Sequence, residues 1–235
     1  MAEELRNWAA DLAAFASETT ANLPGGPGNY IGTSGGILSY KGVPIPGNEF
    51  EVIILDWTNA NLRYEGVYDA ANPASPVCYA FGTDKTGMKP HADSPTPQCS
   101  DCKSCPLNQF GSADVGKGKA CQNTLRLALV PVGALENLLE EEVAYMKIPV
   151  TSVKNFTTLA TIYAQTLKRP PFAMSTFVKG EPGSPMHLLF RAGSPVPDDK
   201  IGVILEKRQM IDVAIPFPYV EPAPKPTKPN RFTRK

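Results

Sequence analysis

Apolar residues recur at helical spacing in two segments of the chain. The first covers residues 2–22 and ends at a Pro/Gly-rich stretch, 23–28. The second covers 153–167, follows a hydroxyl residue that can cap a helix, and stops at Pro170. We therefore expect an amphipathic helix in each segment. Two further helices are expected at 135–142 and 201–210.

Short apolar runs bounded by Gly and Pro predict strands elsewhere. The longest run covers 50–57 and can continue to residue 65, and a run at 37–40 predicts a hairpin with it. Further strands are expected at 125–132, 147–150, 172–179 and 186–191, the last two as a hairpin. Several short strands with one intervening helix favour an α+β, mainly β fold. We expect an antiparallel barrel of the oligonucleotide-binding (OB) type with flanking helices.

Composition divides the chain into three parts. Residues 1–28 form a predicted N-terminal helix and linker, and 29–215 form a predicted OB-like domain. Within that domain, 67–124 is a polar insertion with almost no periodicity, too long for an ordinary loop unless a metal stabilises it. Residues 216–235 are a Pro-rich basic tail. We expect this tail to be disordered because it is too polar to fold alone.

Charge is balanced over the whole chain but not along it. The 235 residues carry 23 basic and 23 acidic side chains, a net charge of zero. The stretch 221–235 has five basic residues and one acid, a local charge of +4, so the rest of the chain sums to −4. The body is therefore not a generally basic surface. No apolar run approaches the roughly 20 residues that a membrane span needs, so we expect no membrane partner.

All five cysteines lie between Cys78 and Cys121. Two thiolates spaced C-x₂-C sit on one tight turn, and a second pair arriving from elsewhere closes a tetrahedral zinc site. One such set is Cys78, Cys102, Cys105 and Cys121. In the alternative, Cys99 and Cys102 form the turn, and His91 is a further candidate ligand. Four thiolates leave no open position, so this zinc would be structural.

The cysteine spacing also allows an iron–sulfur cluster in place of zinc, and it indicates a reducing cellular compartment. The run C-x₂-C-x₂-C followed by Pro106 also resembles iron–sulfur ferredoxins, so an iron–sulfur cluster is the alternative to Zn²⁺. A secreted disulfide framework would spread an even number of cysteines through a short chain. We therefore expect a reducing compartment and a cytoplasmic protein.

A Gly/Lys-rich loop links the cysteine turn to the last cysteine. Residues 111–117 match the start of a phosphate-binding P-loop, but Gly118 stands where Ser or Thr would hold magnesium. No strand leads into the loop, and we exclude nucleotide hydrolysis. Lys117 and Lys119 can contact phosphate, and Phe110 adds an aromatic face. A solvated turn is the alternative.

The sequence contains no recognisable catalytic constellation. Only His91 and His187 are available for general acid–base chemistry, and neither has a predicted partner. The carboxylates at 140–142 form a run that is typical of a solvated helix face. We therefore expect a binding protein and not an enzyme.

Motifs around the cysteines carry a resemblance to a known group. They read CxxCPxNQFGS over 102–112 and GKGKAC over 116–121, with PVC ending at Cys78 and RLAL beginning at Arg126. In these motifs, and in the helix around Tyr163, the chain resembles a group of phage-encoded proteins, some described as single-stranded-DNA-binding. The resemblance covers about residues 40–215. It implies that the zinc ligands are Cys78, Cys102, Cys105 and Cys121, with Cys99 as an extra.

The tail departs from a pattern common in single-strand-binding proteins. Many replicative members end in an acidic tail that recruits partners, whereas this chain ends in a basic, Pro-rich one. We expect the basic tail to add phosphate affinity, because each Lys or Arg contact releases counterions from the nucleic acid.

The leading hypothesis is sequence-tolerant binding of single-stranded DNA in phage replication or recombination, in the host cytoplasm. Such binding needs a positive groove and aromatic faces on which bases stack. The candidate side chains are Tyr40, Trp57, Arg63, Tyr64, Phe110, Lys117, Lys119 and Arg126. The other partners considered are further copies of the chain and host or phage replication proteins.

A rival hypothesis belongs to a different class. The chain is then a phage protein-interaction factor that docks on a host protein through the zinc loop and the N-terminal helix. The zero net charge favours this rival, because nucleic-acid binders more often carry an obvious basic face.

Overall fold

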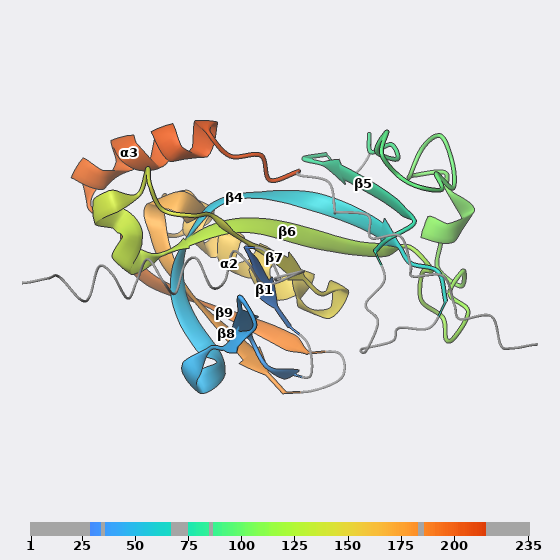
Figure 1. Ribbon diagram of the computed structural model, residues 1–235, viewed down its shortest axis with the longest axis horizontal. Helices are drawn as coiled ribbons and strands as arrows, with labels where there is room; N and C mark the ends of the chain where they lie inside the picture. Colours follow the sequence, from blue (N-terminus) through green and yellow to red (C-terminus); the bar gives the residue numbers. More distant parts are fainter. Residues whose placement is uncertain (1–28, 34–35, 67–74, 85–86, 183–185, 215–235) are drawn as a thin grey trace, which may run out of the picture. The chain divides into compact units, whose positions relative to one another are not determined.

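A computed structural model of the chain describes residues 29–33, 36–66, 75–84, 87–182 and 186–214 (Figure 1). The predicted N-terminal helix within 1–28 and the predicted disordered tail, 216–235, lie outside these residues. The chain divides into two compact units. The first contains 1–56 and 127–211, and the second contains 57–126 and 212–235. The predicted insertion at 67–124 belongs to the second unit.

Nine strands among the described residues form one sheet, in the order β3-β2-β1-β7-β6-β4-β8-β9, with β5 paired to β4. The strands are β1 (Tyr30–Gly32), β2 (Ser39–Tyr40), β3 (Val43–Pro44), β4 (Glu49–Arg63), β5 (Cys78–Gly82), β6 (Gln122–Pro131), β7 (Ala144–Ile148), β8 (Met174–Glu181) and β9 (His187–Pro195). The α-helices of the same residues are α2 (Val153–Gln165) and α3 (Asp198–Gln209). The 3₁₀ turns are η2 (Pro46–Asn48), η3 (Pro106–Asn108), η4 (Val132–Asn137), η5 (Val150–Ser152) and η6 (Pro171–Ala173). The expectation of an α+β, mainly β fold is confirmed.

In the first unit the strands curl strongly, as in a half-barrel (Figure 1). The apolar run 52–55 of β4 is buried at every position, so both faces of the strand are covered. Helix α2 lies against the β8–β9 hairpin. Its Phe156 ring meets Phe190 of β9 edge-on, with 5.6 Å between the centroids, and the Tyr163 hydroxyl donates to the Ser175 carbonyl of β8 at 2.8 Å. The predicted helix and the predicted hairpin are both confirmed.

Helix α3 begins three residues before the predicted start and ends at Gln209. Its first turn carries two acidic residues and its last turn two basic ones, as the helix dipole favours. The buried ammonium of Lys207 donates to the carbonyls of Leu139 at 3.0 Å and Glu141 at 2.7 Å. These bonds attach the end of α3 to the segment that follows η4. No helix in the described part of the chain is long and apolar enough to span a membrane.

In the second unit, strand β5 pairs antiparallel with residues 59–63 of β4. Ala60 and Leu62 of β4 and Tyr79 of β5 form one buried apolar cluster. The Ser94 hydroxyl donates to the Tyr79 carbonyl at 3.0 Å and accepts from the Tyr79 amide at 3.1 Å. The polar segment after β5 therefore folds back onto that strand.

Two strand pairings differ from the predictions. The run 37–40 does not form a hairpin with β4, because β2 pairs with β1 and β3. Lys41 and Gly42 have φ values of 49° and 80°, the left-handed geometry of a two-residue hairpin turn, so β2 and β3 close a small hairpin of their own. In addition, β1 pairs parallel with β7, so the sheet is mixed and not purely antiparallel.

Two segments differ in secondary structure. β5 lies within a stretch that the sequence predicted to be irregular, because its five residues are too few to show a period. The acidic helix expected at 135–142 is replaced by a 3₁₀ turn at 132–137. The carbonyls after this turn are instead bonded by Lys207 of α3, a tertiary contact that local propensity does not reveal.

Candidate functional site

All five cysteines line one small cavity in the second unit. The cavity has a volume of about 10 Å³, close to the space of one water-sized sphere. Three of the thiols, on Cys78, Cys102 and Cys105, are buried, and those of Cys99 and Cys121 are partly buried. The cysteine positions that the sequence singled out are therefore brought together around a single-atom space.

Strands and a tight turn position these thiols. Cys78 is the first residue of β5, opposite Arg63 of β4, and Cys121 directly precedes β6. Between Cys102 and Cys105, the Asp101 carboxylate accepts from the Ser104 amide at 2.9 Å, which closes the turn. The first and last cysteines of the sequence thus lie at the start of β5 and directly before β6.

In the absence of a bound cation, the surroundings of the cavity favour the protonated thiol of Cys102 and Cys121 over the thiolate. Burial, together with the charges of Cys102, Cys78 and Cys105, raises the pKa of Cys121 to about 12. Burial also raises the pKa of Cys102, although a hydrogen bond with Asn61 acts in the opposite direction. The thiols of Cys102 and Cys121 are therefore disfavoured as thiolates near pH 7 unless a cation is bound beside them.

Cys99 and Cys121 differ in the thiols that affect their pKa values. Burial raises the pKa of Cys99 to about 12. A hydrogen bond with Cys105 and the charges of Cys105 and Cys102 act in the same direction. Cys121 instead interacts with Cys78, Cys102 and Cys105. Across the described residues, no three His, Cys, Asp or Glu side chains form a group that could hold a metal ion as they are positioned.

An asparagine network ties the loop after the cysteine turn to two strands. The Asn108 amide donates to the Cys102 carbonyl at 2.7 Å. The Asn123 amide of β6 donates to the side-chain oxygens of Asn108 at 2.9 Å and Asn61 of β4 at 2.6 Å. The Lys119 ammonium donates to the Asn123 oxygen at 3.0 Å. Loop, cavity wall and strands are thus one hydrogen-bonded structure.

The loop tip presents an aromatic ring to solvent. Phe110 is 83% exposed, and the Lys119 ammonium lies 5.1 Å from the centroid of its ring. Gly111 and Gly116 have φ values of 84° and 81°, which let the chain turn at two points after Phe110. Lys117 is exposed next to the second of these glycines. Three of the predicted binding residues therefore share one loop.

Two other predicted residues lie beside the cavity. Arg63 lines it, and its guanidinium donates to the Tyr64 carbonyl at 2.6 Å. Tyr64 packs against the core of the second unit, and burial raises its pKa to about 12. Tyr64 therefore presents little ring surface for stacking.

The remaining predicted residues are spread over both units. Trp57 of β4 is partly buried, and Tyr40 of β2 is partly buried in the first unit with the Lys41 ammonium 5.5 Å from its ring. Arg126 is only 1% exposed, and its guanidinium lies 5.6 Å from the Phe81 ring. In this position Arg126 is a core residue and offers no open surface to a phosphate.

An aromatic stack next to the cavity was not among the sequence predictions. Tyr79 and His91 stack with centroids 5.3 Å apart at 20°, and Phe81 meets His91 edge-on at 6.3 Å. The sequence contained a signal for this stack, because aromatic residues at positions 79 and 81 of one strand lie on the same face of the sheet. The asparagine network had a signal as well, because Asn59 and Asn61 are unusual residues in the interior of a strand.

These features define a candidate nucleic-acid interface beside a candidate metal centre. Neither a protein-family model, nor a curated protein, nor a solved structure matches this chain.

Proposed function

We propose that the chain binds single-stranded DNA, without catalysing a reaction, through the loop at 109–119 on an OB-type barrel. The observation that carries this proposal is the solvent-exposed Phe110 ring with the Lys119 ammonium beside it. An exposed aromatic is costly to maintain in water and suits base stacking, worth about 1–3 kcal/mol per base. Lys117 and Lys119 supply charge for the phosphates on either side.

The surroundings of the loop support this role. Arg63 lies on the wall of the adjoining cavity and adds a cation near the loop base. The asparagine network fixes the loop to β4 and β6, so little conformational entropy is lost when the loop binds. The motifs of 102–121 also resemble a group of phage-encoded proteins, some of them described as single-stranded-DNA-binding, and this is a further reason for the proposal. Replication or recombination in the host cytoplasm is then the setting.

We include a structural zinc in the proposal. What supports it is that Cys78, Cys102, Cys105 and Cys121 line one cavity of about 10 Å³. Zinc would remove the mutual repulsion of the thiolates and supply folding free energy to the insertion. Four thiolates leave no open position for water, so the ion would carry no catalysis. An iron–sulfur cluster on the same cysteines is the alternative cofactor.

The test of DNA binding is a fluorescence-anisotropy titration with labelled dT oligomers at low and moderate salt. We expect Phe110→Ala to weaken binding roughly 5- to 150-fold, the equivalent of one lost stack. Lys89→Ala is the matched control, because Lys89 is exposed in the same unit and outside the loop. No measurable binding at micromolar protein contradicts the proposal.

One observation favours the rival function of protein docking. Val115, on the same loop as Phe110, is 89% exposed, and an aliphatic side chain contributes little to base stacking. The two functions separate in a pull-down from nuclease-treated lysate. Partners bridged by DNA are lost after nuclease treatment, whereas a directly docked protein is retained and depends on Val115.

A further inference from the structure

A second cavity lies wholly within the first unit, and the proposed function does not use it. Its volume is about 210 Å³, the space of about seven water molecules at roughly 30 Å³ each. Its apolar walls include Val52 of β4, Leu129 of β6 and Ala144 of β7, and aromatic surface comes from Tyr40 and Phe50. Water finds few hydrogen-bond partners in such a hollow, whereas an apolar ligand that fills it is stabilised by the surface that it buries.

The strands that carry these walls are held by pairing within the sheet. Val52 of β4 lies opposite Thr176 of β8. Ile31 of β1, which also lines the cavity, lies opposite Tyr40 of β2 on one side and Met146 of β7 on the other. The cavity is therefore formed before a ligand binds, so little conformational entropy is lost in ordering its walls.

Two carboxylates and a hydroxyl lie together on the rim of this cavity. Burial raises the pKa of Tyr40, against the effect of the Lys41 ammonium. The charges of Glu142 and Glu141 raise it as well, so both carboxylates lie near the Tyr40 hydroxyl. The Lys207 ammonium of α3 donates to the backbone carbonyl of Glu141 at 2.7 Å, which fixes this part of the rim.

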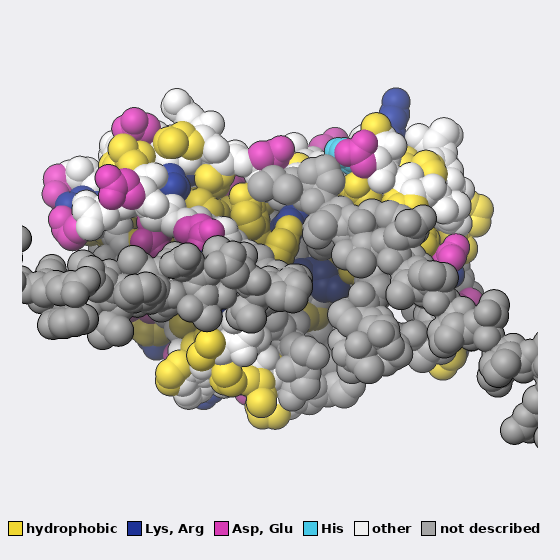
Figure 2. All heavy atoms as spheres, viewed as in Figure 1, with side chains coloured by type: hydrophobic (Ala, Val, Ile, Leu, Met, Phe, Trp, Pro, Cys, Tyr) yellow, Lys and Arg dark blue, Asp and Glu magenta, His cyan; other side chains and the backbone are white. Residues whose placement is uncertain are grey.

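The rim carries an excess of negative charge. The Lys41 ammonium donates to the Glu142 carboxylate at 2.6 Å and neutralises it. No lysine or arginine of the described residues forms an ion pair with Glu141. Figure 2 shows further acidic side chains gathered over α3 and η4. The rim therefore favours a cation and disfavours an anion.

We propose that this cavity binds a small organic cation, an amine whose apolar ring fills the hollow while its ammonium pairs with Glu141. The apolar walls account for the ring, and the Glu141 carboxylate accounts for the ammonium. Tyr40 and Phe50 add ring faces that attract a cation. The proposal goes beyond DNA binding and depends neither on it nor on zinc.

Three molecules that share one ring system and differ in charge test this proposal. Tryptamine carries an ammonium, skatole is neutral and indoleacetate carries a carboxylate. Each is titrated to about 10 mM into the methyl-labelled full-length chain, since a ligand of this size binds with a Kd on the order of 1 mM. We expect tryptamine to shift the NMR signals of Ile31 and Ile45, which line the cavity, and not that of Ile204, which is buried in α3 and does not line it. Skatole should bind about tenfold more weakly, and indoleacetate more weakly still.

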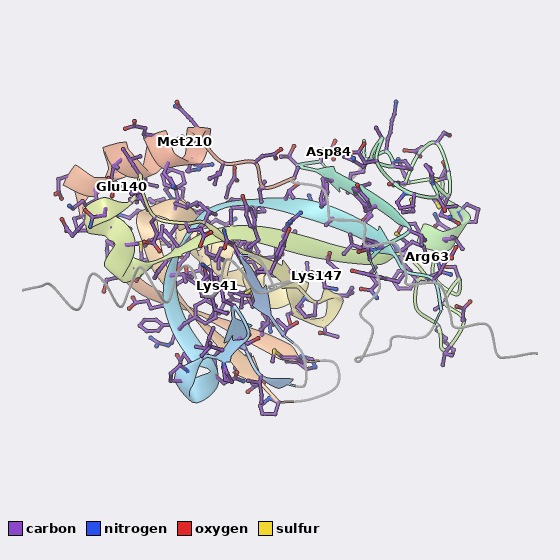
Figure 3. All side chains as sticks on the ribbon, in the orientation of Figure 1. Lys41, Arg63, Asp84, Glu140, Lys147 and Met210 are labelled. Atoms are coloured by element: carbon purple, nitrogen blue, oxygen red, sulfur yellow. The ribbon has the colours of Figure 1, made fainter. Side chains whose placement is uncertain are left out.

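Charge variants test the assignment of Glu141. Glu141→Gln should weaken tryptamine binding about tenfold, as expected for the loss of one hydrogen bond to a charged group, and should leave skatole binding unchanged. Glu140→Gln is the matched control, because Glu140 does not line the cavity and lies away from Lys41 (Figure 3). Lys41→Met should tighten tryptamine binding about two- to fivefold, because it releases the Glu142 carboxylate for the ammonium. Damage to the fold would not produce this tighter binding.

Three outcomes would overturn the proposal. The first is a tryptamine titration that leaves the Ile31 and Ile45 signals unchanged at the highest concentration. The second is equal affinity for tryptamine and indoleacetate, which would show an apolar cavity that does not select charge. The third is equal weakening by Glu141→Gln and Glu140→Gln, which would assign the effect to the general charge of the surface. None of these outcomes affects the anisotropy titration that tests DNA binding.

Discussion

The side-chain amide of Asn108 donates to the carbonyl oxygen of Cys102 at 2.7 Å, and this bond fixes the exposed loop to the cysteine turn. The same side chain accepts from Asn123 of β6 at 2.9 Å. One residue therefore joins three parts of the second unit: the cavity wall, the loop base and the sheet. Removing the Asn108 side chain is therefore expected to destabilise the loop while leaving the side chains at its tip unchanged.

Asn108→Ala is expected to lower the free energy of unfolding by about 1–3 kcal/mol, because it leaves partly buried donors and acceptors without partners. Chemical denaturation measures this change. Asn137→Ala is the control, since Asn137 is exposed in the first unit, and should change the free energy by less than about 0.5 kcal/mol. Equal effects of the two substitutions would contradict the role given to Asn108.

The assignment of four cysteines as zinc ligands and of Cys99 as an extra predicts the metal content of each Cys→Ser variant. Elemental analysis of purified protein is expected to find one zinc per chain. Cys102→Ser and Cys121→Ser lose the zinc and melt at lower temperature, whereas Cys99→Ser keeps it, because the motif resemblance implies that Cys99 is not one of the four ligands. A brown protein that absorbs visible light would assign an iron–sulfur cluster instead. Retention of metal by Cys121→Ser together with its loss in Cys99→Ser would reverse the ligand set.

The gathering of the cysteines could be predicted because it depends on local spacing. A C-x₂-C turn brings two thiols together whatever the rest of the chain does, and Cys78 and Cys121 adjoin strands of the sheet. The helix at 153–167 and the hairpin that it covers were predictable for a similar reason. Their apolar periods are long and end at proline or glycine.

The remaining features depend on contacts between distant residues, and these leave little trace in a local pattern. Asn61 and Asn123 meet because β4 and β6 are neighbours, and no period in either strand indicates that pairing. Arg126 is a candidate phosphate ligand by residue type. Its burial follows from a strand with both faces covered, so the alternation that marks a half-exposed strand is absent.

Salt dependence distinguishes Lys117 from Arg126. Each lost phosphate contact to a single strand reduces the slope of log K against log salt by about 0.7. Lys117→Ala is expected to reduce the slope by about that amount and leave the melting temperature unchanged, since Lys117 is exposed. Arg126→Ala should instead lower the melting temperature, because it removes a buried side chain that packs on Phe81, and should not change the slope. A reduced slope for Arg126→Ala together with an unchanged slope for Lys117→Ala would show that Arg126 becomes accessible when DNA binds.

The ion pair between Lys41 and Glu142 of the first unit, 2.6 Å apart, predicts a pH dependence of stability. A hydrogen bond from Lys41 lowers the pKa of Glu142 in the folded state, and the same bond raises the pKa of Lys41. For a carboxyl group whose pKa is depressed by folding, the stabilisation is present above its unfolded pKa and is lost as the pH falls through the folded pKa. Both side chains are largely exposed, so the contribution at pH 7 is below about 1 kcal/mol. Lys41→Met should therefore lower the free energy of unfolding slightly at pH 7, and denaturation curves of the two proteins should converge below pH 4. A difference that stayed constant from pH 7 to pH 3 would show that Lys41 stabilises the hairpin through packing of its methylene groups and not through its charge.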